Sequence, residues 1–267
     1  MEQIKRKKIG LALGSGGFRG PAHIGIIKTL LKNNIPIDFI AGSSIGAWVG
    51  AHFALYQDIE KLENDFLKKQ RQKITMFSDI SRKGGLIRGE QIEKFLRKIF
   101  NEAEFKNTKI PLKIISTDLV SGEQVVFQKG DLAQAVRASI SIPMTFKPLE
   151  FKDKVLVDGG LSNPVPDNIV RDMGADIVIG VNLYNRYKNE NKKTMFNVIM
   201  RGTEILLYNL AKSNMNDCDI IIEPNTSEFY RTSQLKKFFG DNYEENMMRQ
   251  GEIAAEAAIP KIKDLLK

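Results

Sequence analysis

Short runs of β-branched and other apolar residues alternate along this chain with segments of helical periodicity. The candidate strands are residues 9–13, 37–41, 112–117, 125–127, 155–157, 177–181 and 220–222. The candidate helical faces carry Ile24, Ile27 and Leu31, then Ile92, Phe95, Leu96 and Ile99, and near the end Ile259, Ile262 and Leu266. The alternation predicts an α/β fold, a three-layer sandwich in which helices cover both faces of a mostly parallel central sheet.

The length of the chain favours one domain. It has 267 residues, of which 42% are hydrophobic and 27% charged, and single α/β domains reach about 250 residues. We therefore expect one domain over 1–267, with the recognisable motifs within about 8–183. The remainder, 184–267, adds a polar loop, a helix at about 194–215 that is a candidate cap, one strand and a further helix.

Composition excludes several classes of protein. A single cysteine, Cys218, permits no internal disulfide, and together with only two histidines it cannot build a Cys/His zinc site. We expect neither a metal nor a cofactor. The net charge of +8 favours an anionic partner but does not choose between phospholipid and nucleic acid.

Three segments bear on membranes. The basic N-terminus leads into an apolar run too short for a secretory signal, and the long uncharged stretch 39–57 contains glycines and His52 that favour a strand, a turn and a helix over a membrane span. We expect a soluble cytoplasmic protein. Residues 68–83 are basic around a few large apolar side chains, and they are either a peripheral contact with an anionic inner membrane face or a solvated helix and loop.

The segment GSSIG, residues 42–46, is the most informative local motif. It follows an apolar strand and precedes an apolar helix, the context of a nucleophile elbow in which Gly42 and Gly46 relieve crowding around Ser44. The hydroxyl would then project at a helix N-terminus, where backbone amides favour developing negative charge. The other interpretation is a Gly/Ser-rich turn without chemistry.

A serine nucleophile needs a base, and the histidines fit that role poorly. No histidine follows His52, which excludes the order Ser, acid, His of the α/β-hydrolases. His52 itself lies about 12 Å along one helix from Ser44, and His23 is more typical of a packed or capping side chain. We expect the base not to be histidine.

Asp158 is a second candidate for the site. It ends an apolar strand and precedes Gly159 and Gly160, which permit a tight turn. Sites assemble at strand ends in open parallel sheets, but an aspartate near its usual pKa is a weak base unless it is desolvated or hydrogen-bonded to the serine. The alternative is an ordinary Asp-Gly turn.

The loop GSGGFRG, residues 14–20, comes directly after the first strand. Its amides can converge on one anion, and for an acyl-transfer intermediate they would form an oxyanion hole, with Arg19 orienting the loop or neutralising a phosphate. Dinucleotide binding is the weaker alternative, because Arg19 stands where a third glycine is needed and no acid closes the second strand.

Taken in order, GSGGFRG, GSSIG and DGG resemble the motifs of the patatin-like phospholipase family. The likeness extends to AHIG at 22–25, RASISIP at 137–143 and GLSNPVP at 160–166. The resemblance implies the patatin-like form of the three-layer fold and a serine acyl hydrolase with a Ser–Asp dyad. By motif position, Ser44 is then the nucleophile and Asp158 the base.

The resemblance also assigns the oxyanion hole. The amides around Gly16 and Gly17 would form it, and Arg19 and Gly20 complete the loop. Many members of the family have glycine where this chain has Ser15, so the serine would be strained if that position requires a positive φ. We expect the hole to survive because Gly16 and Gly17 are kept.

The implied reaction is hydrolysis of acyl esters of phospholipids or lysophospholipids through an acyl-enzyme. The expected partner is therefore lipid, and no nucleic acid is expected. Two alternatives stay open: a membrane-surface binding or regulatory module with a vestigial hydrolase site, and an acyltransferase. The acyltransferases of related architecture resemble a Ser–His dyad, for which this chain lacks the downstream histidine.

Overall fold

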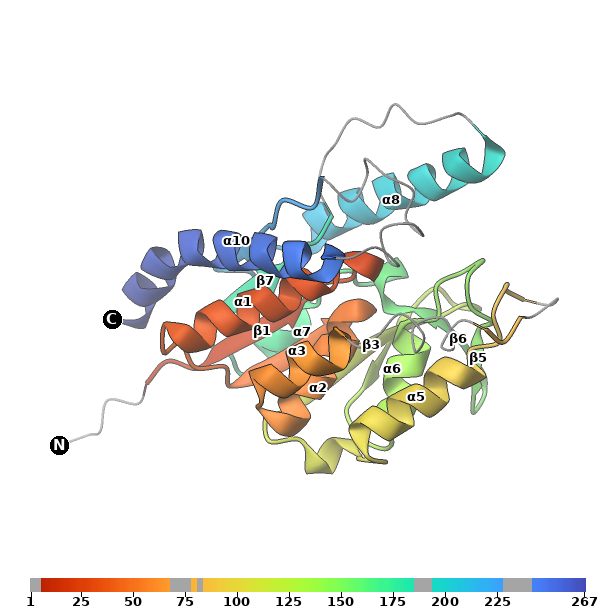
Figure 1. Ribbon diagram of the computed structural model, residues 1–267, viewed down its shortest axis with the longest axis horizontal. Coiled ribbons are helices and arrows are strands. Elements are labelled where there is room, and N and C mark those ends of the chain that lie inside the picture. The colour runs from red at the N-terminus through yellow and green to blue at the C-terminus, as the bar shows by residue number, and fades with distance from the viewer. Residues whose placement is uncertain (1–5, 68–77, 81–83, 185–193, 228–241) are drawn as a thin grey trace.

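One mixed sheet organises the chain. The computed structural model describes residues 6–67, 78–80, 84–184, 194–227 and 242–267 (Figure 1). The sheet has eight strands in the order β5-β6-β3-β2-β1-β7-β8, with β4 paired to β3. Its strands are β1 (Ile9–Leu13), β2 (Phe39–Ser43), β3 (Leu112–Asp118), β4 (Gln124–Phe127), β5 (Leu149–Phe151), β6 (Lys154–Asp158), β7 (Ile177–Val181) and β8 (Ile220–Ile222).

The sheet has a parallel part, which runs from β3 to β8, and an antiparallel part made by β4, β5 and β6. Strands β3, β2, β1, β7 and β8 form four parallel pairs, whereas β4 and β6 run antiparallel to β3, and β5 runs antiparallel to β6. The expectation of a mostly parallel sheet therefore holds for the half built by βαβ crossovers. The strands joined by short turns form the antiparallel part, because such connections reverse the chain.

Helices cover both faces of the sheet, as the sequence predicts. They are α1 (Pro21–Lys32), α2 (Ile45–Tyr56), α3 (Ile59–Phe66), α5 (Glu90–Phe100), α6 (Leu132–Ser139), α7 (Asp167–Asp172), α8 (Met195–Asn214) and α10 (Tyr243–Leu266), with short turns η1 (Gly17–Arg19), η2 (Phe105–Asn107) and η3 (Gly159–Leu161). Alternate strand residues enter separate cores: Leu11 and Leu13 lie in the larger one, and Ala12 lies in the smaller. The fold is the expected three-layer sandwich.

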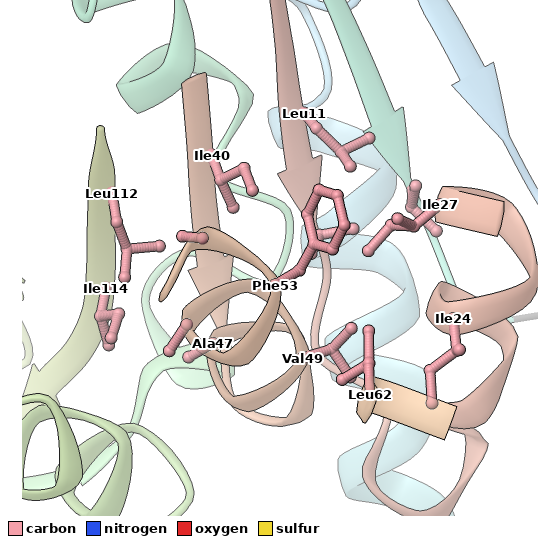
Figure 2. Packing of buried hydrophobic residues seen from close by; sticks show 14 of the residues in the cluster. Leu11, Ile24, Ile27, Ile40, Ala47, Val49, Phe53, Leu62, Leu112 and Ile114 are labelled. Atoms are coloured by element: carbon pink, nitrogen blue, oxygen red, sulfur yellow. The ribbon is translucent and has the colours of Figure 1, made fainter. Parts of the chain in front are cut away.

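The larger core lies under α1, α2 and α3. Figure 2 shows Leu11 and Ile40 of the sheet packed with Phe53 of α2, and Ile24 of α1 close to Leu62 of α3. Burying a side chain of this size contributes about 1.5–3 kcal/mol. The packing in this layer therefore fixes the position of α2 on the sheet. One predicted core residue of α1 is misplaced: Leu31 is 37% exposed.

The C-terminal helix packs directly on the first helix. A Cβ atom on Gly25 of α1 would lie 1.9 Å from the Met248 carbonyl oxygen, and one on Gly251 of α10 would lie 2.0 Å from the Ala22 carbonyl oxygen. Any larger side chain at either glycine would push the two backbones apart. Together with the pairing of β8 to β7, this contact joins the end of the described chain to its beginning.

Candidate active site

Ser44 lies in the turn between β2 and α2 with a backbone conformation that is unusual for serine. Its φ is 56° and its ψ is −124°, and the side chain is buried. The flanking glycines permit this turn: a Cβ on Gly42 would lie 2.5 Å from the Gly46 carbonyl oxygen, and one on Gly46 would lie 2.1 Å from the Leu13 carbonyl oxygen. Such strain persists only where the surrounding structure enforces it.

Asp158 reaches Ser44 because two strands meet end to end along β3. Ser43 pairs with Ile115, and Asp158 pairs with the next residue, Ser116. Strand β4 pairs with β3 over both of these positions, so it occupies one edge of β3. Strands β2 and β6 therefore share the other edge and run toward each other.

Asp158 does lie at a strand end, but the expected reason for its place in the site, a strand end of an open parallel sheet, is wrong. Strand β6 is antiparallel to β3. Its last residue meets the end of β2 because of the pairing register, which periodicity in the sequence does not specify.

The two side chains are in direct contact. The Ser44 hydroxyl donates to Asp158 Oδ2 over 2.5 Å, and the Gly160 amide donates to Asp158 Oδ1 over 2.8 Å. Burial raises the pKa of Asp158 to about 6, although both hydrogen bonds act to lower it. The carboxylate is therefore ionised at neutral pH and is more basic than an exposed aspartate.

Two serines that the sequence analysis gave no role hold this pair in place. The Ser44 amide donates to Ser139 Oγ over 2.8 Å, and Ser139 donates to the Ile115 carbonyl. The Asp158 amide donates to the Ser141 carbonyl over 3.0 Å, and the buried Arg137 guanidinium donates to Ser141 Oγ. The segment RASISIP contains all three polar residues, and a charged side chain at the end of an otherwise apolar helix was the available signal.

The glycine loop contacts the residues that follow Ser44 and Asp158. A Cβ on Gly20 would lie 2.1 Å from Ile45 Cγ1, and one on Gly160 would lie 2.6 Å from Ser15 Oγ. Within the described residues the amides of Gly16 and Gly17 donate no hydrogen bond. Gly17 has a φ of 57°, and a Cβ there would meet nothing within 4 Å. The loop therefore lies against both turns and carries two amides that donate no hydrogen bond within the described residues.

Arg19 supports this loop from behind. It is buried, its Nε donates to the Gly16 carbonyl over 2.8 Å, and its guanidinium lies 4.8 Å from the centre of the Tyr184 ring. These contacts favour the loop-orienting role over neutralisation of a phosphate. Tyr184, which the sequence analysis did not single out, also shares a 3.0 Å hydrogen bond with Ser15. Ser15 is not among the described residues with positive φ, so the expected strain there is absent.

Neither histidine is hydrogen-bonded to Ser44. His23 Nε2 donates to the Gly14 carbonyl over 2.8 Å, and burial lowers its pKa to about 4, so it is a neutral brace for the loop. His52 Nε2 contacts Asp65 Oδ2 at 2.8 Å, between α2 and α3. That histidine does not serve as the base stays a prediction.

The described residues lack a metal-binding group and a membrane-spanning helix. No three His, Cys, Asp or Glu side chains in the described residues are grouped to hold a metal ion. No helix of the described chain is long and apolar enough to span a bilayer. The basic segment 68–83 falls, apart from 78–80, outside the described residues.

Comparison with known proteins defines the class. The family model for patatin-like phospholipase matches residues 11–169, which is more than half of the chain and includes the serine turn, the aspartate turn and the glycine loop. The chain therefore belongs to the patatin-like phospholipase family.

Bacterial and animal relatives match about two thirds of the chain. An "Uncharacterized NTE family protein" of Mycobacterium tuberculosis is 38% identical over 176 residues, 66% of this chain and 49% of the relative. The "Patatin-like phospholipase domain-containing protein 7" of Rattus norvegicus is 33% identical over 184 residues, 67% of this chain and 14% of the relative. The chain spans half the length of these relatives or less.

A solved structure shares the fold. The crystal structure of VipD from Legionella pneumophila aligns with a TM-score of 0.57 at 14% identity, over 96% of this chain and 67% of that one.

Proposed function

We propose that the protein is a serine acyl hydrolase that cleaves acyl esters of phospholipids or lysophospholipids through a Ser44–Asp158 dyad. The observation that carries the proposal is the 2.5 Å hydrogen bond from a strained, buried serine to a carboxylate with a raised pKa. Membership of the family supports lipid as the substrate class. The rat relative is itself named as a phospholipase-domain protein.

The acylation step follows from the contacts at the dyad. Ser44 Oγ attacks the ester carbonyl carbon while its proton passes to Asp158 Oδ2. The oxyanion is received by the amides of Gly16 and Gly17, and the N-terminus of α2 adds a favourable dipole. Collapse of the intermediate expels the alcohol, which takes the proton from Asp158, and leaves an acyl-enzyme.

Deacylation uses the same groups in reverse. Asp158 deprotonates a water molecule that attacks the acyl carbonyl, and the proton returns to Ser44 as the fatty acid leaves. The proposed reaction requires no group beyond this chain and water. A location in the cytoplasm with peripheral contact at the inner membrane face would suit such a substrate.

The deciding experiment compares two neighbouring serines. Ser44→Ala is expected to abolish hydrolysis of a p-nitrophenyl acyl ester, with a loss of at least about 10³-fold, and to abolish labelling by a fluorophosphonate probe. Ser43→Ala is the matched control, because its buried hydroxyl has no hydrogen-bond partner in the described part of the chain. Full activity of Ser44→Ala, or equal losses in both variants, would refute the assignment.

The same probe separates the remaining interpretations. A vestigial site in a membrane-binding module would not be labelled, and an acyltransferase would form ester products when acceptor alcohols are added. We expect labelling, and release of free fatty acid as the main product.

We also propose that residues 1–267 act as one domain. The support is that α10 packs on α1 and that β8 extends the sheet at β7. Deletion of 243–267 would uncover the α1 face and is expected to give an insoluble or unfolded chain. A soluble, cooperatively folding product would contradict the proposal.

A further inference from the structure

The outer face of α8 changes character halfway along the helix. Five large apolar side chains in its first twelve residues are between 43% and 80% exposed: Met195, Val198, Ile199, Ile205 and Leu206. At 100° per residue they fall with Gly202 on one stripe about 120° wide. The same face then becomes polar, with Asn209 and Ser213 exposed in the second half.

Among the described side chains of α8, those that pack on a core lie in the second half of the helix. Ala211 is buried in the smaller core, and Leu207 and Tyr208 pack against that core. The charged residues of the first half, Arg201 and Glu204, contact each other at 3.4 Å and are mostly buried. The apolar stripe therefore carries no charge of its own.

The connection of α8 places the start of this stripe at the same edge of the sheet as Ser44. The helix lies between the end of β7 and the start of β8, which are parallel. Its first residues therefore lie toward the carboxyl edge of the sheet, the edge at which β2 leads into Ser44. The tip between β3 and β4, where Leu119 and Val120 are exposed, lies at that edge as well.

The lengths of the elements require α8 to extend past the strand it follows. Its 20 residues extend about 30 Å, whereas the five residues of β7 extend about 17 Å. Figure 1 shows the first turns of α8 reaching well past the ends of α1 and α10. The apolar half of the outer face is thus the half that projects.

We infer that the apolar stripe of α8 is a docking surface for a phospholipid bilayer, which brings the edge of the sheet with Ser44 to the lipid. A helix face with exposed large apolar residues, no charge and polar flanks is typical of interfacial insertion. A second copy of the chain is the weaker occupant. A face about 18 Å long and 10 Å wide is far smaller than the roughly 800 Å² per partner of a stable dimer. The inference rests on the proposed lipid hydrolase function to explain why the protein would bind a bilayer. Its test measures binding alone and does not need that function.

The test uses two double variants of the same helix with the same added charge. Val198→Glu with Leu206→Glu changes the stripe, and Asn209→Glu with Ser213→Glu changes the polar half of the same face. All are made in the full chain carrying Ser44→Ala, and binding is measured by co-sedimentation with phosphatidylcholine vesicles at low and high salt.

The stripe variant is expected to bind vesicles at least about tenfold more weakly than the parent, and the control variant within twofold of it, at both salt concentrations. Equal binding by the stripe variant and the parent would overturn the inference. The inference would also be overturned if the parent did not bind vesicles, or if the parent were a dimer in solution and the stripe variant a monomer.

A second measurement separates this inference from the proposed function. With Ser44 present, the stripe variant should lose hydrolysis of vesicle phospholipid at least tenfold and keep its kcat/KM on a soluble p-nitrophenyl ester. Vesicle binding without any hydrolysis would leave the docking surface standing and refute the hydrolase. An equal loss on the soluble ester would make the stripe a structural element of the site and overturn the inference.

Discussion

The turns at Ser44 and Asp158 form one site but arise in different ways. The Ser44 turn has a local signature: strand, Gly42, Ser44, Gly46 and helix follow one another, and the serine between the two glycines has a positive φ. The Asp158 turn is an ordinary strand end until β6 pairs with β3 in the observed register. The comparison teaches that the proposed nucleophile is built by the sequence around it and the proposed base by a strand pairing.

The largest expected effect breaks the base and leaves the elbow intact. Asp158→Asn keeps the shape of the side chain and removes its ability to take a proton from Ser44. Turnover of a p-nitrophenyl ester should fall by about 10³-fold or more. A fall smaller than tenfold, with the fold verified by circular dichroism, would assign the base to another group.

The pH profile tests whether the environment of Asp158 differs from that of an exposed aspartate. Because the base must be ionised and its pKa is about 6, kcat/KM should fall about tenfold per unit below that pH. A carboxylate with an ordinary pKa would keep the rate level to about pH 4. A level profile between pH 7 and 5 in folded protein would contradict the desolvated environment.

A smaller effect should follow from loosening the elbow without touching either reacting group. Ser139→Ala leaves the buried Ser44 amide unpaired, at a cost of about 1–3 kcal/mol in unfolding free energy. Turnover should fall by about tenfold to a hundredfold because the serine is less well positioned. The pH dependence should keep its midpoint near 6, and a shifted midpoint would mean that Ser139 acts on Asp158 instead.

The last expected effect is on stability and has the opposite sign to the effect on activity. The folded pKa of Asp158 is raised from 3.8 to about 6, so ionising it destabilises the fold. The cost is absent below about pH 4, grows as the pH rises through 6 and is then constant near 3 kcal/mol.

Asp158→Asn avoids that cost. The variant should therefore unfold at a higher temperature than the wild type at pH 7.5, and the difference should shrink toward zero as the pH falls to 4.5. Thermal unfolding followed by circular dichroism across this range measures it. A variant that is less stable than the wild type at pH 7.5 would contradict the desolvation of the carboxylate.

Much of the fold was predictable because buried strands consist of short runs of apolar residues. Strand β1 has the predicted bounds, and the helix expected at about 194–215 is α8 at Met195–Asn214. Strand β2 begins two residues later than predicted. The residue before it, Asp38, uses its side chain to accept a hydrogen bond from the Ile9 amide and lies outside the strand pairing. Strand β5 was missed because Leu149–Phe151 is short and has a charged centre.

The residues of the candidate site were more predictable than the hydrogen bonds between them. The glycines around Ser44 are visible in the sequence because local backbone geometry requires them. The roles of Ser139 and Tyr184 are not visible, because each depends on a partner that is remote along the chain.

The sequence by itself determined the alternation of strands and helices and the glycines that permit the serine turn and the glycine loop, because each depends on neighbouring residues. Only the tertiary structure decided that Asp158, 114 positions away, faces Ser44, since strand register is set by pairing across the sheet. It also decided that half of α8 projects beyond the sheet. The helix is longer than the strands that it connects. Which part of it extends past them depends on how the helix packs on the sheet.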